Sequence, residues 1–95
     1  MHIITRKRLI EFSRRHPDAR LPLNYWYSIV SKTDIASFAE LRITFPSADQ
    51  VRNFTVFNIA ENRYRLIVAI HYNRKKVYIR HVLTHAEYNR NRWRE

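Results

Sequence analysis

Two arginines and a His–Tyr pair in the C-terminal third of the chain have side chains suited to chemistry on a phosphate. Arg65 lies inside the apolar run RYRLIVAIHY, and Arg80 lies inside a second apolar run, VYIRHVL. A guanidinium stays charged, and its fork matches the oxygens of a phosphate. His85 and Tyr88 are spaced i, i+3, so one helical turn would place both on one face. Because imidazole titrates near neutral pH, this set predicts a domain that cuts or binds RNA.

RNA can be cut without a metal if three tasks are met. The 2′-hydroxyl must be activated, the crowded phosphorane must be neutralised, and the leaving 5′-oxygen must be protonated or stabilised. Arginine suits the second task, and His, Tyr, Glu or Lys can transfer the protons. Residue types alone do not assign these roles. The candidate catalytic set is therefore Arg65, Arg80, His85 and Tyr88.

These candidates also have structural interpretations. Arg65 shares strand parity with Ile67 and could be an edge residue whose aliphatic chain carries its charge to solvent. Tyr88 could anchor the C-terminal segment, or it could stack on a base. Both alternatives stay open at the level of the sequence.

Arg80 has an alternative partner as well. Strand parity places it with Tyr78 and Val82, and its guanidinium could pair with the carboxylate of Glu61 or Glu87 instead of a phosphate. Sequence spacing does not separate the two interpretations.

The remaining histidines are weaker candidates. His71 and His81 are interpreted as packed strand residues, and His2 and His16 as surface residues. His81 and His85 have i, i+4 spacing, but a strand end separates them and no third ligand is evident, so no metal site is expected.

Positive charge is concentrated around the predicted hairpin. No carboxylate lies between Glu61 and Glu87. Six cations occupy that stretch: Arg63, Arg65, Arg74, Lys75, Lys76 and Arg80. Arg63 and the cluster at the hairpin tip, flanked by Tyr72 and Tyr78, are predicted to contact the RNA backbone, although a solvated turn would have the same composition. The RNA-binding candidates are Arg63, Arg74, Lys75 and Lys76.

The composition limits the class of protein. A chain of 95 residues with 45% hydrophobic residues predicts a single folded domain, 1–95. A net charge of +10 indicates a polyanionic partner. The absence of cysteine excludes disulfides, and the absence of glycine excludes P-loops and dinucleotide fingerprints, so no cofactor is expected. The chain has neither an apolar signal core nor a run of about 20 apolar residues, which predicts a cytoplasmic location without membrane association.

Strands dominate the second half of the chain. Two arms rich in β-branched and aromatic residues, 64–72 and 77–83, predict an antiparallel hairpin joined by the turn 73–76, and a further strand is expected over 51–59. Asn62 and Asn73 are the expected substitutes for glycine where the turns need positive φ.

Helices are expected in the first half. Thr5 is a candidate cap for a helix over 6–15, and Pro22 suits the first turn of a helix over 22–32. Asp34 could cap a short third helix ending at Leu41, before a turn at 46–49. After Thr84 the pattern predicts a short helix or a frayed basic tail over 86–95. This order predicts an α+β fold with N-terminal helices on one side of a small, mostly antiparallel sheet.

Several spaced motifs together resemble a known family. The chain is similar to the HigB-type toxins of bacterial toxin–antitoxin systems, within the RelE/ParE superfamily. The motifs are Trp26-Tyr27, FPSAD (45–49), VFNI (56–59), NRYRLI (62–67), VYIR (77–80) and THAEY (84–88). Two positions depart from the pattern: Ala60-Glu61-Asn62 stands where the family commonly has Gly-Gly-Asn, and Asn89 stands where it has Asp.

The resemblance implies a RelE-like fold and a ribosome-dependent mRNA endonuclease that needs no metal and is inhibited by a helix-turn-helix antitoxin. It also implies that Arg65 is the phosphate-binding arginine. Two other functions stay open: a gyrase-directed toxin of the ParE kind, and a non-catalytic basic module that binds RNA. The THAEY segment argues against the gyrase-directed toxin.

Overall fold

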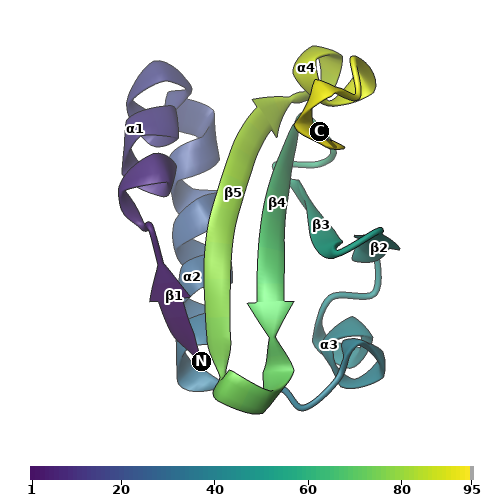
Figure 1. The fold of residues 1–95 in the computed structure, drawn as a ribbon. Helices are drawn as coiled ribbons and strands as arrows, with labels where there is room; N and C mark the ends of the chain where they lie inside the picture. The colour runs from purple at the N-terminus through teal and green to yellow at the C-terminus, as the bar shows by residue number, and fades with distance from the viewer. Residues whose placement is uncertain (95) are drawn as a thin grey trace.

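A five-stranded sheet runs through the centre of the molecule, which the computed structural model describes over residues 1–94 (Figure 1). Across the sheet the order is β1 (His2–Ile4), β5 (Lys76–Thr84), β4 (Tyr64–His71), β3 (Phe54–Ile59) and β2 (Asp49–Val51). Within the described chain, β1 and β5 run parallel and the other neighbouring strands run antiparallel. The predicted hairpin is confirmed to within one residue at each strand end, and a short 3-10 turn, Tyr72–Arg74, forms its tip.

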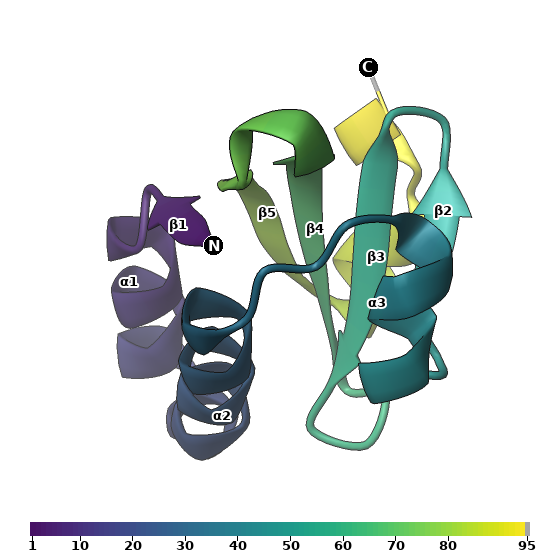
Figure 2. The ribbon, with the colours of Figure 1, turned by 90° about the horizontal axis from the view of Figure 1, so that it is seen from below.

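Three helices cover one face of this sheet, as the view from below shows (Figure 2). They are α1 (Lys7–Arg15), α2 (Arg20–Lys32) and α3 (Phe38–Thr44). The short C-terminal helix α4 (His85–Asn89) and the turn Arg92–Arg94 lie at one end of the hairpin and on the opposite side of the sheet. The predicted architecture, with N-terminal helices on one side of a mostly antiparallel sheet and a short C-terminal helix, is confirmed. Glu95, the last residue of the expected tail, lies outside the described residues.

The main core lies between these helices and the sheet. Leu66 and Val68 of β4 are fully buried in it, whereas Ile67 between them points to the other face, as the two-residue period of a strand requires. From α2, Trp26 enters the core and meets Phe57 of β3 edge to face, with ring centroids 5.4 Å apart. The face of α2 that carries Leu23, Trp26 and Val30 is therefore its packed face.

A β-bulge interrupts β5 at Arg80. Ile67 pairs with His81 and Val68 pairs with Ile79, so Arg80 has no opposite residue on β4. One extra residue reverses the inside–outside alternation of everything beyond it. The predicted parity is therefore wrong for Val82, which packs against the helix-side core, while Arg80 borders a groove on the other face. Tyr78 shares the face of Arg80 as predicted, since it pairs with Ala69 at the same groove.

The starts of two helices differ from the expected ones. Thr5 does not cap α1; its backbone has φ 75°, and Arg6 occupies the cap position without a side-chain hydrogen bond. The chain must turn sharply there, because β1 pairs with β5 and α1 begins immediately afterwards. The third helix begins at Phe38 instead of following Asp34, since the Ser37 hydroxyl accepts a hydrogen bond from the Glu40 amide at 3.2 Å.

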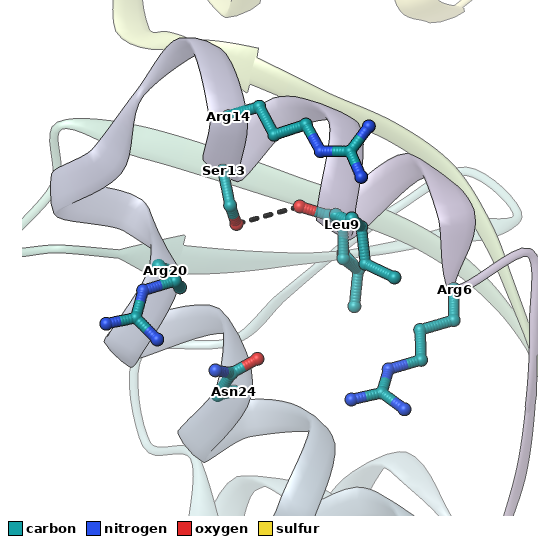
Figure 3. A pocket seen from close by; sticks show the side chains of 7 residues that line it. Arg6, Leu9, Ser13, Arg14, Arg20 and Asn24 are labelled. Atoms are coloured by element: carbon teal, nitrogen blue, oxygen red, sulfur yellow. Dashed lines mark hydrogen bonds between the residues drawn. The ribbon is translucent and has the colours of Figure 1, made fainter.

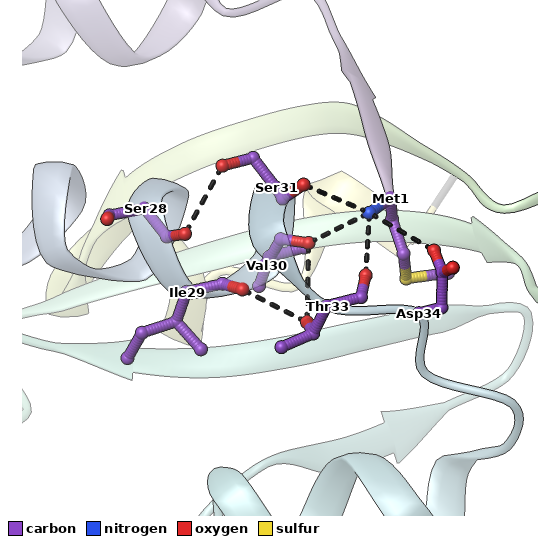
Figure 4. A network of polar contacts seen from close by, with 7 residues as sticks. All are labelled: Met1, Ser28, Ile29, Val30, Ser31, Thr33 and Asp34. Carbon is purple, nitrogen blue, oxygen red and sulfur yellow. Dashed lines mark hydrogen bonds and ion pairs between the residues drawn. The ribbon is translucent and has the colours of Figure 1, made fainter.

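The first residues form a strand that the sequence did not indicate. His2 to Ile4 pair with β5, and the nitrogen of Met1 donates hydrogen bonds to three carbonyl oxygens at the end of α2 (Figure 4). The acceptors are Val30, Ser31 and Thr33, at 3.1, 3.3 and 2.6 Å. These carbonyl oxygens need hydrogen-bond donors from outside the helix, because a helix leaves its last carbonyls without intrahelical donors. The contact fixes β1 against the helical layer.

The turns adopt left-handed conformations without glycine. Ala60, Glu61 and Asn62 have φ values of 53°, 56° and 75° between β3 and β4. Asn62 thus has the predicted positive φ. At the hairpin tip the prediction for Asn73 is wrong, because Lys75 takes the left-handed position with φ 57°. The Ala60–Asn62 turn leads directly into Arg65.

Candidate active site on the open face of the sheet

A second, small core covers part of the open face, which is the sheet face turned away from α1 to α3. Val56 and Ile67 are buried there under Trp93, whose side chain is only 4% exposed. The turn Arg92–Arg94 brings Trp93 back to the sheet, where the indole Nε1 donates to the Tyr88 carbonyl at 2.9 Å. Trp93 was not predicted from the sequence as part of the site. The signal for it was the presence of an aromatic residue within a basic tail.

Helix α4 is fixed by a capping box. The Thr84 hydroxyl accepts from the Glu87 amide at 3.2 Å, and the Glu87 carboxylate accepts from the Thr84 amide at 2.9 Å. The bond from that backbone amide is the main reason the pKa of Glu87 lies below its usual value. The Glu87 carboxylate is therefore used to cap the start of the helix. Tyr88, the next residue, has a defined position as a result.

Arg65 and Tyr88 meet at the end of the sheet. The Arg65 guanidinium carbon lies 5.4 Å from the centroid of the Tyr88 ring. Tyr88 in turn stacks on Trp93, with centroids 5.0 Å apart and ring planes inclined by 13°. The result is a three-layer stack that holds a half-buried cation beside the sheet end.

The Arg65 side chain is also held by the turn before β4. Its Nη1 donates to the carbonyl oxygens of Asn62 at 2.9 Å and Tyr64 at 3.2 Å. A guanidinium has five N–H donors. Within residues 1–94, the hydrogen bonds of Arg65 come from Nη1, so its Nε and Nη2 groups are available to a ligand. A cation fixed in this way is preorganised for an anion.

His85 is exposed at the first turn of α4, and its Nδ1 lies 3.1 Å from the Nδ2 of Asn89. An amide can donate to a ring nitrogen or accept from it, so this contact suits either neutral tautomer of His85. An aspartate at this position could only accept. The departure from the family pattern at Asn89 therefore removes the requirement for a proton on Nδ1.

The middle of the open face forms a groove of about 730 Å³. Arg80 and His81 from β5, His71 from β4, and Phe54 and Trp93 border it. The expected packing of the two histidines is only partly seen, since His81 is half-buried and His71 is exposed. Burial, together with the nearby charges of Arg8 and Arg80, lowers the pKa of His81 below 6.5.

Arg80 makes no ion pair with a carboxylate of residues 1–94. Its guanidinium carbon lies 5.8 Å from the Tyr78 ring centroid. Neither Glu61 nor Glu87 is its partner, so the alternative interpretation of Arg80 is wrong. Its charge faces the groove.

The four RNA-binding candidates do not lie together. Arg63 is paired with Asp18 at 2.8 Å, and the Tyr64 hydroxyl donates to the same carboxylate at 2.6 Å. Those two contacts lower the pKa of Asp18. The other three candidates lie at the hairpin tip, at the opposite end of β4 from Arg65 (Figure 1): Arg74, Lys75 and Lys76. Eight strand residues separate the ends, roughly 26 Å at about 3.3 Å per residue.

Residues 1–94 contain neither a cluster of metal ligands nor a helix suited to a membrane. No three His, Cys, Asp or Glu side chains in residues 1–94 come together as a metal site would require. Over the same residues, none of the helices combines the length and apolar character needed to cross a membrane.

Comparison with known proteins gives consistent matches. A family model described as "HigB_toxin, RelE-like toxic component of a toxin-antitoxin system" matches residues 19–91. An mRNA interferase HigB of Escherichia coli O6:H1 is 30% identical over 93 residues, covering 95% of this chain and 90% of the relative. The mRNA interferase toxin HigB of Escherichia coli K12 and the mRNA interferase HigB of Shigella flexneri are each 30% identical over 92 residues, with 94% and 88% coverage.

Proposed function

The chain belongs to the HigB family of RelE-like toxins, and from this membership we propose that it is the toxin of a type II toxin–antitoxin pair. Its proposed activity is ribosome-dependent cleavage of mRNA without a metal, in the cytoplasm. A helix-turn-helix antitoxin protein is its proposed inhibitor. The relatives named mRNA interferase support the reaction class, and the +10 charge supports a nucleic-acid substrate.

The observation that carries the proposal is the placement of Arg65 over Tyr88 beside the open-face groove. The stack supplies a fixed cation 5.4 Å from a phenol ring, and the groove adds Arg80 and two histidines. An RNA strand lying along this face would meet charge for its phosphates and rings for its bases. This is a surface on which one phosphate could be held from two sides.

The proposed reaction is attack by the 2′-oxygen on the adjacent phosphorus. A P–O2′ bond forms, the P–O5′ bond breaks, and the products are a 2′,3′-cyclic phosphate and a 5′-hydroxyl. Arg65 and Arg80 neutralise the phosphorane, and the Tyr88 hydroxyl donates a hydrogen bond to one of its oxygens. The lowered pKa keeps His81 neutral near pH 7, the form that accepts the 2′ proton. The imidazolium form of His85 donates a proton to the leaving 5′-oxygen and becomes neutral imidazole.

A binding module without catalysis is the second candidate, because the same residues also have structural partners. Arg65 is bonded to two backbone carbonyls, and Tyr88 packs in the small core with Trp93. In that case the stack would anchor the C-terminal segment and the groove would only hold RNA. The two candidates differ in whether the Tyr88 hydroxyl matters.

The test is mRNA cleavage by the purified chain with and without ribosomes, comparing Tyr88→Phe with the parent protein. Tyr88→Phe keeps the stacked ring, so we expect cleavage to fall at least about tenfold with ribosome binding unchanged. Tyr25→Phe, an exposed tyrosine on α2, is the matched control and should cleave like the parent.

The product ends test the chemistry. Cyclic phosphate ends, and loss of cleavage when the scissile nucleotide lacks its 2′-hydroxyl, are expected for attack by the 2′-oxygen. Products with 5′-phosphate ends would indicate attack by water and contradict the proposed mechanism. Ribosome binding by the folded parent without any cleavage would leave the binding module as the function.

A further inference from the structure

A groove with an arginine rim lies between α1 and α2, on the helix-covered side of the molecule (Figure 3). The cavity has a volume of about 290 Å³. Leu9 and Ile10 supply its apolar floor, and its rim includes Arg6, Arg14, Arg20 and Asn24. The close view shows Arg6 reaching in from one end and Arg20 lying at the other, around the same space.

The rim charge is not neutralised by the protein. No carboxylate lines the groove. Within residues 1–94, Arg14 and Arg20 take part in none of the ion pairs, and Arg6 lies over the Tyr27 ring, 4.2 Å from its centroid. Three guanidinium groups around one cavity repel one another, so an anionic ligand would be favoured there.

Apolar surface continues beside the rim. Ile10, which lines the groove, is 45% exposed, and Leu21, which follows the rim residue Arg20 in the chain, is 69% exposed. Tyr25 borders a separate cavity with Phe45 and Phe57. An exposed apolar side chain inside a charged rim is typical of an interaction surface.

We propose that this groove binds an acidic amphipathic segment of the antitoxin, with one large apolar side chain in the cavity and carboxylates on the arginines. The proposal rests on the proposed function, because that function supplies the protein partner. The aliphatic floor argues for a protein segment over RNA. It gives a base no flat aromatic face to stack on, and a phosphate gains nothing from contact with Leu9 and Ile10.

The position of the groove has a consequence for inhibition. It lies on the side of the helices, whereas the Arg65–Tyr88 stack lies on the open face. A segment bound here adds affinity without covering the candidate active site. Binding and inhibition are therefore separable functions of the antitoxin.

The test is the affinity of the proposed helix-turn-helix antitoxin, in purified form, for the double variant Arg14→Glu/Arg20→Glu. Reversing two rim charges should weaken binding by at least about 30-fold. Ile10→Ser, which reduces the apolar floor, should weaken it by about tenfold. The matched control Lys32→Glu/Arg52→Glu makes the same charge change on exposed residues away from the groove and should bind like the parent.

Cleavage assays on the same variants separate the outcomes. The groove variants should cut mRNA within about twofold of the parent rate, since distant sites act independently. Antitoxin affinity equal to that of the parent in both groove variants overturns the proposal. Loss of ribosome binding with antitoxin affinity unchanged would assign the groove to RNA instead. A parent protein that binds antitoxin through the groove and never cuts mRNA contradicts the proposed function alone.

Discussion

At one end of the β4–β5 hairpin, Arg65 is bonded to two carbonyl oxygens and stacked on Tyr88, whereas at the other end Arg74 and Lys76 extend from a short turn. Both ends carry positive charge. At the first end packing, a capping box and a folded-back tail hold the cation in one place. Among the described residues, the side chains at the tip form no ion pair.

This difference separates two contributions to one activity. A fixed charge can stabilise a transition state because no reorganisation is needed when the charge develops. A mobile charge attracts a polyanion at long range, and the attraction is screened by salt. We therefore assign reaction rate to the Arg65 end and affinity to the tip.

The largest expected effect, on the cleavage rate, tests the end of the hairpin at which Arg65 is held. Arg65→Ala should lower the cleavage rate by about 100- to 1,000-fold, because a preorganised donor to the phosphorane is lost. Arg65→Lys should recover little, since an ammonium cannot make the bidentate contact. Single-turnover cleavage on saturating ribosomes measures this step.

Arg42→Ala is the matched control for Arg65, because its Nη2 also bonds a backbone carbonyl, that of Pro46 at 2.9 Å. It should cleave at the parent rate. If Arg65→Lys were as active as the parent, Arg65 would supply only general charge, and the contrast between the two ends would disappear.

A smaller effect is expected at the tip. Replacing Arg74, Lys75 and Lys76 with Gln should reduce the log–log salt slope of ribosome binding by roughly two, because each phosphate contact contributes about 0.7 to 0.9. The rate at saturation should stay near that of the parent. Binding measured across a salt series gives both values.

The control for the tip removes three charges from the helical side, in Arg14→Gln/Arg20→Gln/Lys32→Gln. Its slope should match the parent slope. An unchanged slope in the tip variant would make that cluster a solvated turn.

The smallest effect concerns His81, which lies between the two ends. Its pKa is lowered in the folded state mainly by burial, so the unfolded chain binds a proton first as the pH falls below 6.5. The free energy of unfolding should therefore decrease on acidification from pH 6.5, and decrease less in His81→Gln. Denaturant titrations at several pH values measure the difference.

The exposed Asn73 provides the comparison, since Asn73→Gln changes no titratable group and should follow the parent. A His81→Gln protein with the parent's pH dependence would show that this imidazole is not kept neutral by folding. It would then be a poor base in the proposed mechanism.

Long periodic segments could be predicted from the sequence. The arms of the hairpin and the helix over 22–32 each repeat an apolar pattern over several residues, and the predicted hairpin places Arg65 near the start of one arm and Tyr88 beyond the end of the other. These features follow from local pattern and from topology.

Features that depend on a single residue or on distant contacts could not be predicted. The bulge at Arg80 leaves no mark in a run that is apolar on both sides. The strand His2–Ile4 is too short to show alternation and exists because β5 offers an edge. Trp93 reaches the sheet only after the tail turns back, which no local pattern reveals.

The absence of glycine has a consequence for engineering this protein. Replacing a glycine raises thermostability where its backbone conformation suits other residues, because the freedom of the unfolded chain is reduced. Within residues 1–94, seven residues other than glycine have positive φ, among them Ala60 and Glu61. Each such residue costs about 1 kcal/mol or more in the folded state, because its Cβ crowds the backbone. More heat-resistant forms of this chain should therefore be reached by introducing glycine at such turns instead of removing it.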